Sequence, residues 1–213
     1  MTRYEDLLDL MRSRRSIRRF TERAVTRGDV ERLLEAARWA PSNHNRQAWK
    51  FLVFEERTQI RALAEMVRRS LAGKLKSLPA VAAGYADELV HYATIFAEAP
   101  VLLVALHKPP ASVSLPLLAG VPHPELVSGE PLSVAMAVQN LLLAAQTLGL
   151  GTCVLTGPLL VQDAFAGGLS LPAGFELNCF VALGHPAESP EAPRRKSLDN
   201  IAEFRNDAPQ IKP

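Results

Sequence analysis

Residues 132–156 read LSVAMAVQNLLLAAQTLGLGTCVLT, and this stretch decides the fold. The segment 132–148 is apolar nearly all round, which predicts a helix in the middle of the protein, because a helix without a polar face must be covered on every side. Gly149 suits the left-handed conformation that ends many helices. The short run 152–156 then predicts a strand. The sequence therefore indicates a central helix that leads directly into a sheet.

Three further apolar runs predict strands: AWKFLVF (48–54), VLLVAL (101–106) and FELNCFVAL (175–183). The second is apolar at every position, which is typical of a strand covered on both faces. Helical spacing of apolar residues predicts helices over 3–13, from about 26 to Pro41, from Thr58 onward and over 85–98. These elements place the chain in the α+β class, as a small central β-sheet wrapped by helices.

Two segments do not fit this pattern. Residues 108–130 contain five prolines and predict an irregular connection of the kind that often serves as a lid or binding loop. From Ser189 the chain is rich in proline and charge, which predicts an extended C-terminal arm. We therefore expect one domain over residues 1–188 and an arm over 189–213.

The charge of the chain is nearly balanced, with 24 Lys and Arg against 22 Asp and Glu. Five arginines nevertheless crowd into RSRRSIRRF, residues 12–20. This cluster could bind nucleic acid, end a helix in solvent, or form a pocket for a small phosphorylated ligand. A net charge of only +2 is a weak footprint for a polyanion and favours the small ligand. A basic nucleic-acid-binding module built on Arg12–Arg19 stays open as the alternative.

The sequence contains no recognisable set of catalytic side chains. Its five histidines are scattered, and no Gly-x-Ser-x-Gly, Cys-x-x-Cys or metal-ligand spacing accompanies them. A cofactor is therefore expected to carry any chemistry. Cys153 and Cys179 lie in apolar runs, which predicts that both thiols are buried and unreactive. Two cysteines without a disulfide framework also fit a reducing compartment. With no signal peptide and no membrane span apparent, we expect a soluble cytoplasmic protein.

Two basic clusters and one polar turn are the candidate ligand groups. Arg14, Arg15, Ser16 and Arg18 combine guanidinium groups with a hydroxyl, which suits a phosphate. A second basic cluster, residues 194–196, lies in the arm and could close over the same phosphate. Between them the turn PSNHNRQ offers uncharged donors and acceptors suited to a polar heterocycle, namely Ser42, Asn43, Asn45 and Gln47.

Four motifs in this order resemble the nitroreductase family of flavoproteins: RRSIRRF, EAARWAPSNHNRQAWKFLVF, NLLLAAQTLGLGTCVLTG and VALGHPAE with PRRKSL. The resemblance covers about residues 4–201. It implies a nitroreductase-like fold and a homodimer that binds one FMN in each of two sites at the subunit interface. It also implies ping-pong transfer of a hydride from NAD(P)H to flavin N5, then of two electrons to a nitroaromatic, quinone, activated alkene or aldehyde. Some family members catalyse other reactions, including reductive dehalogenation.

The resemblance also implies roles for individual residues. Arg14, Arg15 and Ser16 match contacts to the FMN phosphate tail, and Arg18 matches the cation near N1 and the C2 carbonyl of the ring. Leu155, Thr156 and Gly157 match the turn whose backbone N–H faces flavin N5, so Arg18, Thr156 and Gly157 are the expected catalytic residues. The remaining positions comprise the segment from the partner subunit, a helix position and the tail cations: Pro41, Ser42, Asn43, Asn45 and Gln47; Ser133; Arg194 and Lys196, with Arg195 as an alternate.

The chain departs from the family pattern in two places. The Pro-x-Glu-Gly turn of some members is Val154 to Gly157 here, so a glutamate side chain is missing while a backbone donor survives. The common Gln-Pro-Trp is Gln47-Ala48-Trp49. The electron acceptor, the choice between NADH and NADPH, and the residues at the pyrimidine edge of the flavin are left open by the sequence.

Overall fold

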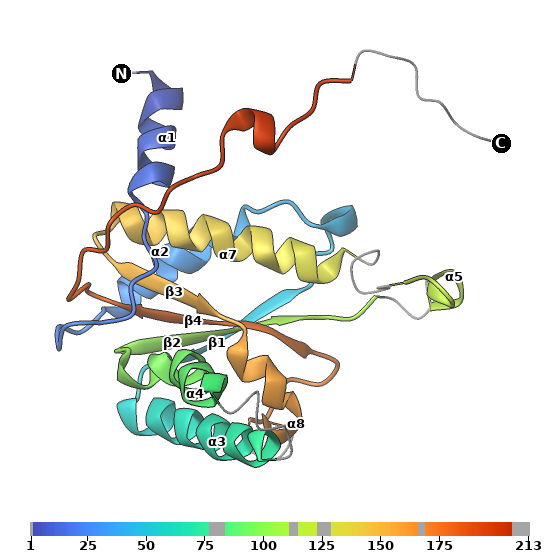
Figure 1. The fold of residues 1–213 in the computed structure, drawn as a ribbon. Coiled ribbons are helices and arrows are strands. Elements are labelled where there is room, and N and C mark those ends of the chain that lie inside the picture. Colours follow the sequence, from blue (N-terminus) through green and yellow to red (C-terminus); the bar gives the residue numbers. More distant parts are fainter. Residues whose placement is uncertain (1, 77–83, 111–114, 123–128, 166–168, 206–213) are drawn as a thin grey trace.

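A four-stranded antiparallel sheet, with strand order β1-β2-β4-β3, forms the centre of the computed structural model (Figure 1). The structure describes residues 2–76, 84–110, 115–122, 129–165 and 169–205. The strands are β1 (Trp49–Phe54), β2 (Val101–His107), β3 (Gly151–Leu155) and β4 (Glu176–Gly184). Strands β1 and β3 are therefore the two edges of the sheet.

Strand β2 is buried on both faces, as its solidly apolar sequence predicts. Its side chains alternate between two separate cores. Val101, Leu103 and Ala105 pack into one core, whereas Leu102, Val104 and Leu106 pack into the other. Every one of these six side chains is at most 2% exposed. Helices must therefore cover both faces of the sheet.

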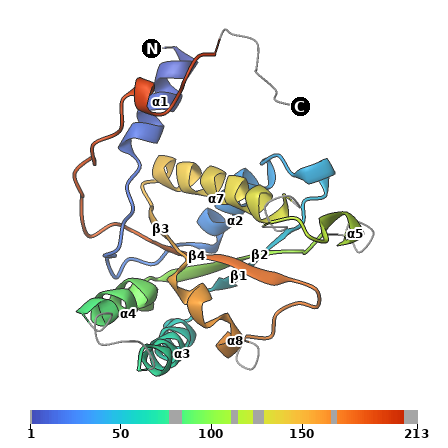
Figure 2. The same ribbon diagram turned by 45° about the vertical axis from the view of Figure 1, so that its right-hand side comes forward.

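Two helical layers provide this cover (Figures 1 and 2). Helices α2 (Arg27–Arg38) and α7 (Glu130–Thr147) pack on one face. Helices α3 (Arg57–Leu75) and α4 (Ala86–Thr94) pack on the other, together with α8 (Gln162–Phe165). Short 3₁₀ turns complete the described chain: η1 (Asn43–Asn45), η3 (Ile95–Glu98), η5 (Gly157–Val161) and η6 (Leu198–Asn200).

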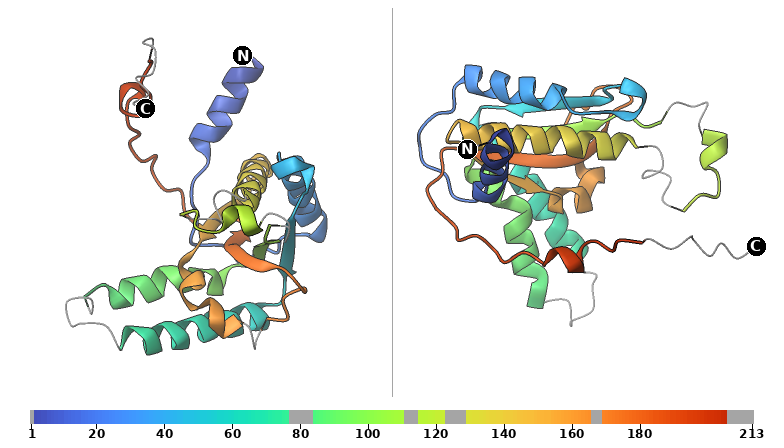
Figure 3. Two further views of the ribbon diagram at one scale, coloured as in Figure 1. Left: turned by 90° about the vertical axis from the view of Figure 1, so that its right-hand side faces the viewer. Right: turned by 90° about the horizontal axis from the view of Figure 1, so that it is seen from above.

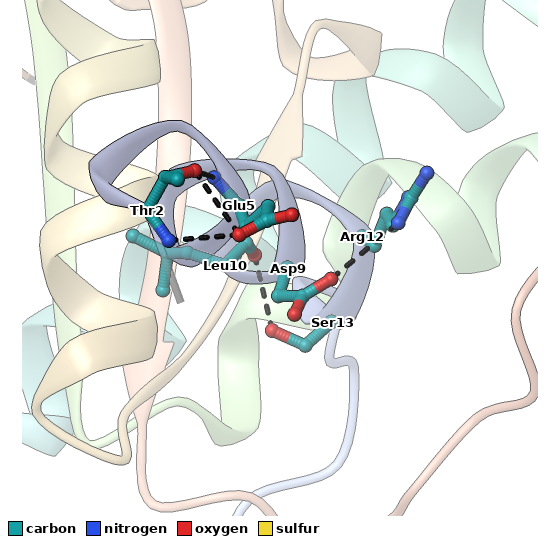
Figure 4. Close-up of polar contacts among 6 residues, drawn as sticks. All are labelled: Thr2, Glu5, Asp9, Leu10, Arg12 and Ser13. Atoms are coloured by element: carbon teal, nitrogen blue, oxygen red, sulfur yellow. Dashed lines mark hydrogen bonds and ion pairs between the residues drawn. The ribbon is translucent and has the colours of Figure 1, made fainter.

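Helix α1 (Arg3–Ser13) stands away from this body and buries none of its residues. Its N-terminus is held by a capping box, in which the Thr2 hydroxyl accepts from the Glu5 N–H and the Glu5 carboxylate accepts from the Thr2 N–H (Figure 4). The C-terminal arm leaves the body beside α1 (Figure 3). Both segments therefore extend beyond the core of the single chain.

The predicted elements are all present, with shifts at their ends. Helix α7 begins at Glu130, earlier than the predicted Leu132, because Pro131 lies in its first turn, where the missing N–H of a proline costs nothing. The helical segment predicted over 85–98 divides into α4 and η3. Within the predicted 108–130 loop a short helix, α5 (Leu115–Leu118), forms, whereas 111–114 and 123–128 lie outside the described residues.

Both cysteines are free and buried, as predicted. Burial raises the pKa of the Cys179 thiol to about 12 and also raises that of Cys153, so neither is a ready thiolate near neutral pH. Within the ranges that the structure describes, no helix is long and apolar enough to cross a membrane, and no cluster of metal-ligating side chains occurs.

Candidate functional site

The arginine segment follows α1 and runs along the open edge of β3. Ser16 forms an isolated parallel bridge with Thr152, and the Ile17 N–H donates to the Thr152 carbonyl over 2.9 Å. Gly151 permits this approach, because a Cβ at that position would lie 2.7 Å from the Ile17 Cβ. The sheet edge thus holds the arginines at a defined position.

A pocket of about 380 Å³ opens where this segment meets the arm. Its wall contains four arginines, three from the arginine segment and one from the arm, and this concentration of positive charge suits a phosphate dianion. The lining residues are Arg14, Arg15, Ser16, Arg18, Pro190, Glu191, Pro193 and Arg195.

The five clustered arginines have different partners. Arg12 pairs with Asp9 at 3.5 Å on the exposed side of α1 (Figure 4). Arg19 pairs with Glu188 at 3.1 Å. The Arg15 guanidinium donates to three backbone carbonyls, one of them Pro190 of the arm at 3.2 Å.

The two remaining arginines of the cluster, Arg14 and Arg18, could bind a ligand in the pockets. Within the described chain, the Arg14 guanidinium has neither a hydrogen-bond nor an ion-pair partner, and the Arg18 guanidinium has no carboxylate partner. The Arg18 guanidinium instead lies 5.9 Å from the centre of the Tyr92 ring and donates at 3.4 Å to the Ser16 carbonyl. Arg14 and Arg18 are therefore the arginines best able to meet an anionic ligand.

A second pocket, of about 400 Å³, adjoins the first and shares Arg18 with it. Its walls are mainly apolar and come from α4, the end of β3 and η5. Val154 and Leu160 remain 39% and 50% exposed here, although both are apolar. An aromatic heterocycle would cover them while facing the Arg18 charge. The lining residues are Arg18, Leu89, Tyr92, Ala93, Ile95, Cys153, Val154, Leu155, Thr156, Gly157 and Leu160.

A backbone donor lies in the same pocket. Gly157 is the first residue of η5, where an N–H has no acceptor within the helix. The adjacent Leu159 N–H bonds to the Thr156 carbonyl, whereas the Gly157 N–H makes no backbone bond to another part of the described chain. This N–H remains available to a ligand.

The turn 41–47 lies elsewhere and is held under strain. His44, Asn45 and Gln47 have positive φ values of 48°, 53° and 47°, a conformation that non-glycine residues rarely adopt. Side-chain bonds hold the turn: the Asn43 N–H donates to Ser133 Oγ at 3.1 Å, and the Gln47 N–H to Ser42 Oγ at 3.0 Å. The structure thus brings Ser42, Asn43, Asn45, Gln47 and Ser133 together.

Sequence reasoning missed the ion pair that anchors this turn. Arg46 pairs with Glu130 at the start of α7, and the Glu130 side chain is only 1% exposed. A buried carboxylate without its cation costs several kcal/mol, so the pair fixes the turn on α7. The acidic residue before Pro131 was the only sequence signal for it.

The two groups of site residues lie at opposite ends of α7. Ser133 is in the first turns of the helix, whereas Gln146, in its last turn, donates at 3.4 Å to Ser13 Oγ beside the arginine segment. With a rise of 1.5 Å per residue, these positions are separated by about 20 Å along the helix. One chain therefore does not bring the turn 41–47 to the arginines.

The arm contributes differently from the sequence expectation. Arg195, which we expected only as an alternate, lines the phosphate-sized pocket, whereas Arg194 and Lys196 are exposed and are not among its described lining residues. Their role at a phosphate remains a prediction. Tyr92 was also missed, because an exposed tyrosine on a helix gives no sequence signal until its neighbour Arg18 is known.

Comparison with known proteins shows the family of the chain. The sequence signature described as the Nitroreductase family matches residues 11–185, most of the chain. The chain belongs to the nitroreductase family. The resemblance inferred from the four motifs and the predicted α+β fold are thereby confirmed.

Three proteins illustrate the range of this family. A Methanothermobacter thermautotrophicus protein named as NADH dehydrogenase/NAD(P)H nitroreductase is 28% identical, with 87% of this chain and 80% of its own covered. An iodotyrosine deiodinase from Thermotoga neapolitana is 28% identical, with 90% and 95% covered. A solved nitroreductase from Desulfovibrio desulfuricans, in complex with FMN, is 28% identical, with a TM-score of 0.67 and 95% and 98% covered.

We predict that Gly157→Ala destabilises the protein by about 1–3 kcal/mol, because the new Cβ would overpack this turn. It would lie 2.9 Å from the Ala93 Cβ and 3.1 Å from its Cα, on the helix that carries Tyr92. Urea unfolding measures the change. Gly73→Ala is the control: nothing lies within 4 Å of its Cβ in α3, so this variant should gain about 0.5–1 kcal/mol. Equal stabilities for the two variants would contradict the prediction.

Proposed function

We propose that this nitroreductase-family chain is an FMN-dependent oxidoreductase that takes a hydride from NAD(P)H and delivers two electrons to an electron-poor acceptor. The observation that carries the proposal is the pair of adjoining pockets that share Arg18, one lined by cations and the other mainly apolar. Together they match the two ends of a flavin mononucleotide. The FMN complex of the Desulfovibrio relative supports the same cofactor.

The residues of both pockets fit FMN in chemical type. Arg14, Ser16 and Arg195 offer charge-assisted donors for the phosphate. Val154 and Leu160 offer exposed apolar surface for the ring. Among the described lining residues, neither wall supplies the glycine-rich turn that dinucleotide cofactors use for a second phosphate. This composition favours FMN over FAD.

Bound FMN would supply the redox chemistry, accepting a hydride from NAD(P)H and returning two electrons to the acceptor. The share of this chain is binding and electrostatics. Arg18 stabilises negative charge that develops on a ring in the second pocket, an effect of preorganised charge. The Gly157 N–H adds a hydrogen bond from the turn after β3, and Thr156 shapes that turn. Thus Arg18, Thr156 and Gly157 are our candidate catalytic residues.

The acceptor class is tested by steady-state assays with NADH and with NADPH against a nitroaromatic, a quinone, an activated alkene and an aldehyde. The Thermotoga relative adds iodotyrosine to this panel, because reductive deiodination is a second candidate reaction. Parallel-line kinetics with at least one acceptor are expected from a ping-pong enzyme. Purified protein that neither carries nor takes up FMN would contradict the proposal.

We place the enzyme in the cytoplasm, where its two free thiols would stay reduced.

We further propose that the site is completed by a second copy of the chain. The distance along α7 separates the turn 41–47 from the arginines of the same chain, so the turn would contact the flavin that is bound mainly by the partner.

Apolar residues are also left uncovered on α1, α7 and the arm. They are Tyr4 (71% exposed), Leu7 (47%), Met11 (46%), Leu132 (48%), Met136 (40%), Leu198 (76%), Ile201 (65%) and Phe204 (91%).

A homodimer would cover this surface, since obligate interfaces resemble a core divided between two chains. Helix α1 supports the proposal, because an isolated helix of this length is marginal in water and here buries no residue. We thus propose that residues 1–188 form the FMN-binding domain and that the arm, predicted over 189–213 and described as far as Arg205, lies on the partner. Arg194 and Lys196 would then contact a phosphate bound there.

We predict that Arg14→Ala weakens FMN binding about 10- to 100-fold, because the phosphate loses a charge-assisted bond worth about 1.5–3 kcal/mol. Flavin fluorescence titration measures the affinity. Arg12→Ala is the matched control, since its guanidinium pairs with Asp9 on the exposed side of α1. That variant should stay within about twofold of wild type. Equal losses from both variants would instead indicate that the arginines act only as a solvated helix end.

We also predict that FMN binding and dimerisation are thermodynamically linked, because groups from both copies would contact one flavin. Light scattering of the holo and flavin-stripped protein over a dilution series, with flavin fluorescence read in parallel, tests the linkage. The holoprotein should stay dimeric to lower concentration than the stripped protein. A monomer that retains FMN tightly at high dilution would refute the shared site.

A further inference from the structure

Glu188 lies just after β4 and clamps the backbone of the arginine segment. Its Oε1 accepts a hydrogen bond from the Arg18 N–H at 2.6 Å and another from the Arg19 N–H at 3.1 Å. Its Oε2 accepts from Arg19 Nε at 3.1 Å. The Glu188 side chain is 17% exposed, whereas that of Arg19 is 75% exposed, so the contact is shielded from solvent only on the Glu188 side.

No other described group takes the place of this carboxylate. Within the described chain, the Arg18 and Arg19 N–H groups make no other hydrogen bond. The flanking backbone is tied separately, by Ile17 to Thr152 and by the Ala187 N–H to the Arg19 carbonyl, each at 2.9 Å. Glu188 therefore holds the backbone between these two contacts, at Arg18, the residue that lines both pockets.

The carboxylate is kept ionised at this position. Burial raises the pKa of Glu188, but the hydrogen bonds from the Arg18 and Arg19 backbone and from the Arg19 side chain outweigh burial and hold the pKa below its usual value. Two adjacent N–H groups with one ionised acceptor make a strong and directional contact.

The charge of Glu188 opposes the ligand that this site would bind. A carboxylate beside an anion pocket repels a phosphate and a reduced flavin, and it also neutralises Arg19. Charge alone would therefore predict that removing Glu188 improves flavin binding. Its geometry predicts the opposite, because the Arg18 backbone would lose its acceptor.

We propose that Glu188 is a positioning residue that fixes Arg18 at the junction of the phosphate and ring pockets. The inference rests on the proposed FMN function and extends it to a residue outside both pocket walls. Glu188 does not contact the ligand in this account; it acts through the Arg18 backbone.

The test compares Glu188→Gln with wild type for two properties of the flavin: the FMN dissociation constant and the midpoint potential of the bound cofactor. The amide oxygen of Gln carries no formal charge, so its bonds to the two backbone N–H groups are weaker. The amide NH₂ that replaces Oε2 is a donor, so it cannot accept from Arg19 Nε and that bond is lost. We expect the dissociation constant to rise at least tenfold and the midpoint potential to become more negative, since a displaced Arg18 stabilises reduced flavin less. A purely structural role would not move the potential.

Two further variants separate position from charge. Glu22→Gln removes the same charge at a position that is not in the described wall of either pocket, where the exposed carboxylate pairs with Arg57 at 2.8 Å. It should bind FMN within about twofold of wild type. Glu188→Asp keeps the charge but shortens the side chain by one methylene, so it should be impaired like Glu188→Gln. Glu188→Asp also tests the positioning role if Glu188→Gln does not fold.

The outcomes distinguish this inference from the function on which it rests. Wild-type protein that takes up no FMN contradicts the function itself. Wild-type protein that binds FMN, with Glu188→Gln equal to it or tighter and unchanged in potential, overturns the positioning role alone. Amide hydrogen exchange of the flavin-free protein gives an independent measure. The Arg18 and Arg19 amides should exchange at least tenfold faster in Glu188→Gln. Equal rates would show that Glu188 does not hold these two N–H groups and would refute the inference.

Discussion

Burial of β2 on both faces is the constraint on which the rest of the structure depends. Six consecutive apolar side chains alternate between two cores, so neither face of the sheet can be left to solvent. One face takes α2 and α7, and the other takes α3 and α4. Because helices occupy both faces, the open edges are where further chain can pair with the sheet. The arginine segment uses the β3 edge, and the candidate site lies beside it for that reason.

Much of this fold could be predicted from the sequence, because its signals are local. Apolar spacing located the four strands of the sheet and the longer helices α1, α2, α3, α4 and α7, whereas the short helices α5 and α8 were not predicted. The order of strands could not be predicted in the same way. It depends on pairings such as Val101 with Leu183, which join distant parts of the chain and leave no local pattern. The end of α7 was placed well by Gly149 and its start less well, because the apolar pattern begins after Pro131.

In the candidate site, too, residues within local motifs could be predicted, whereas residues that act through tertiary contacts could not. The motifs located Arg14, Arg18 and Gly157, and these residues do line the two adjoining pockets. Residue type could not tell apart the clustered arginines, whose partners are set by the tertiary structure. Glu130 and Glu188 escaped notice for a related reason. Each acts on a group that is distant in sequence, one on a guanidinium and the other mainly on backbone N–H groups.

The turn between α2 and β1 has a consequence for how its sequence can vary. His44, Asn45 and Gln47 all have positive φ, a conformation whose cost glycine would reduce and a β-branched residue would increase. Asparagine, already present at position 45, tolerates this conformation better than most other residues. Variation at these positions is then restricted by the backbone, whether or not a ligand touches them. A mutational scan that found valine and isoleucine excluded here would be recording the shape of the main chain. Such intolerance alone would not identify these three side chains as ligand contacts.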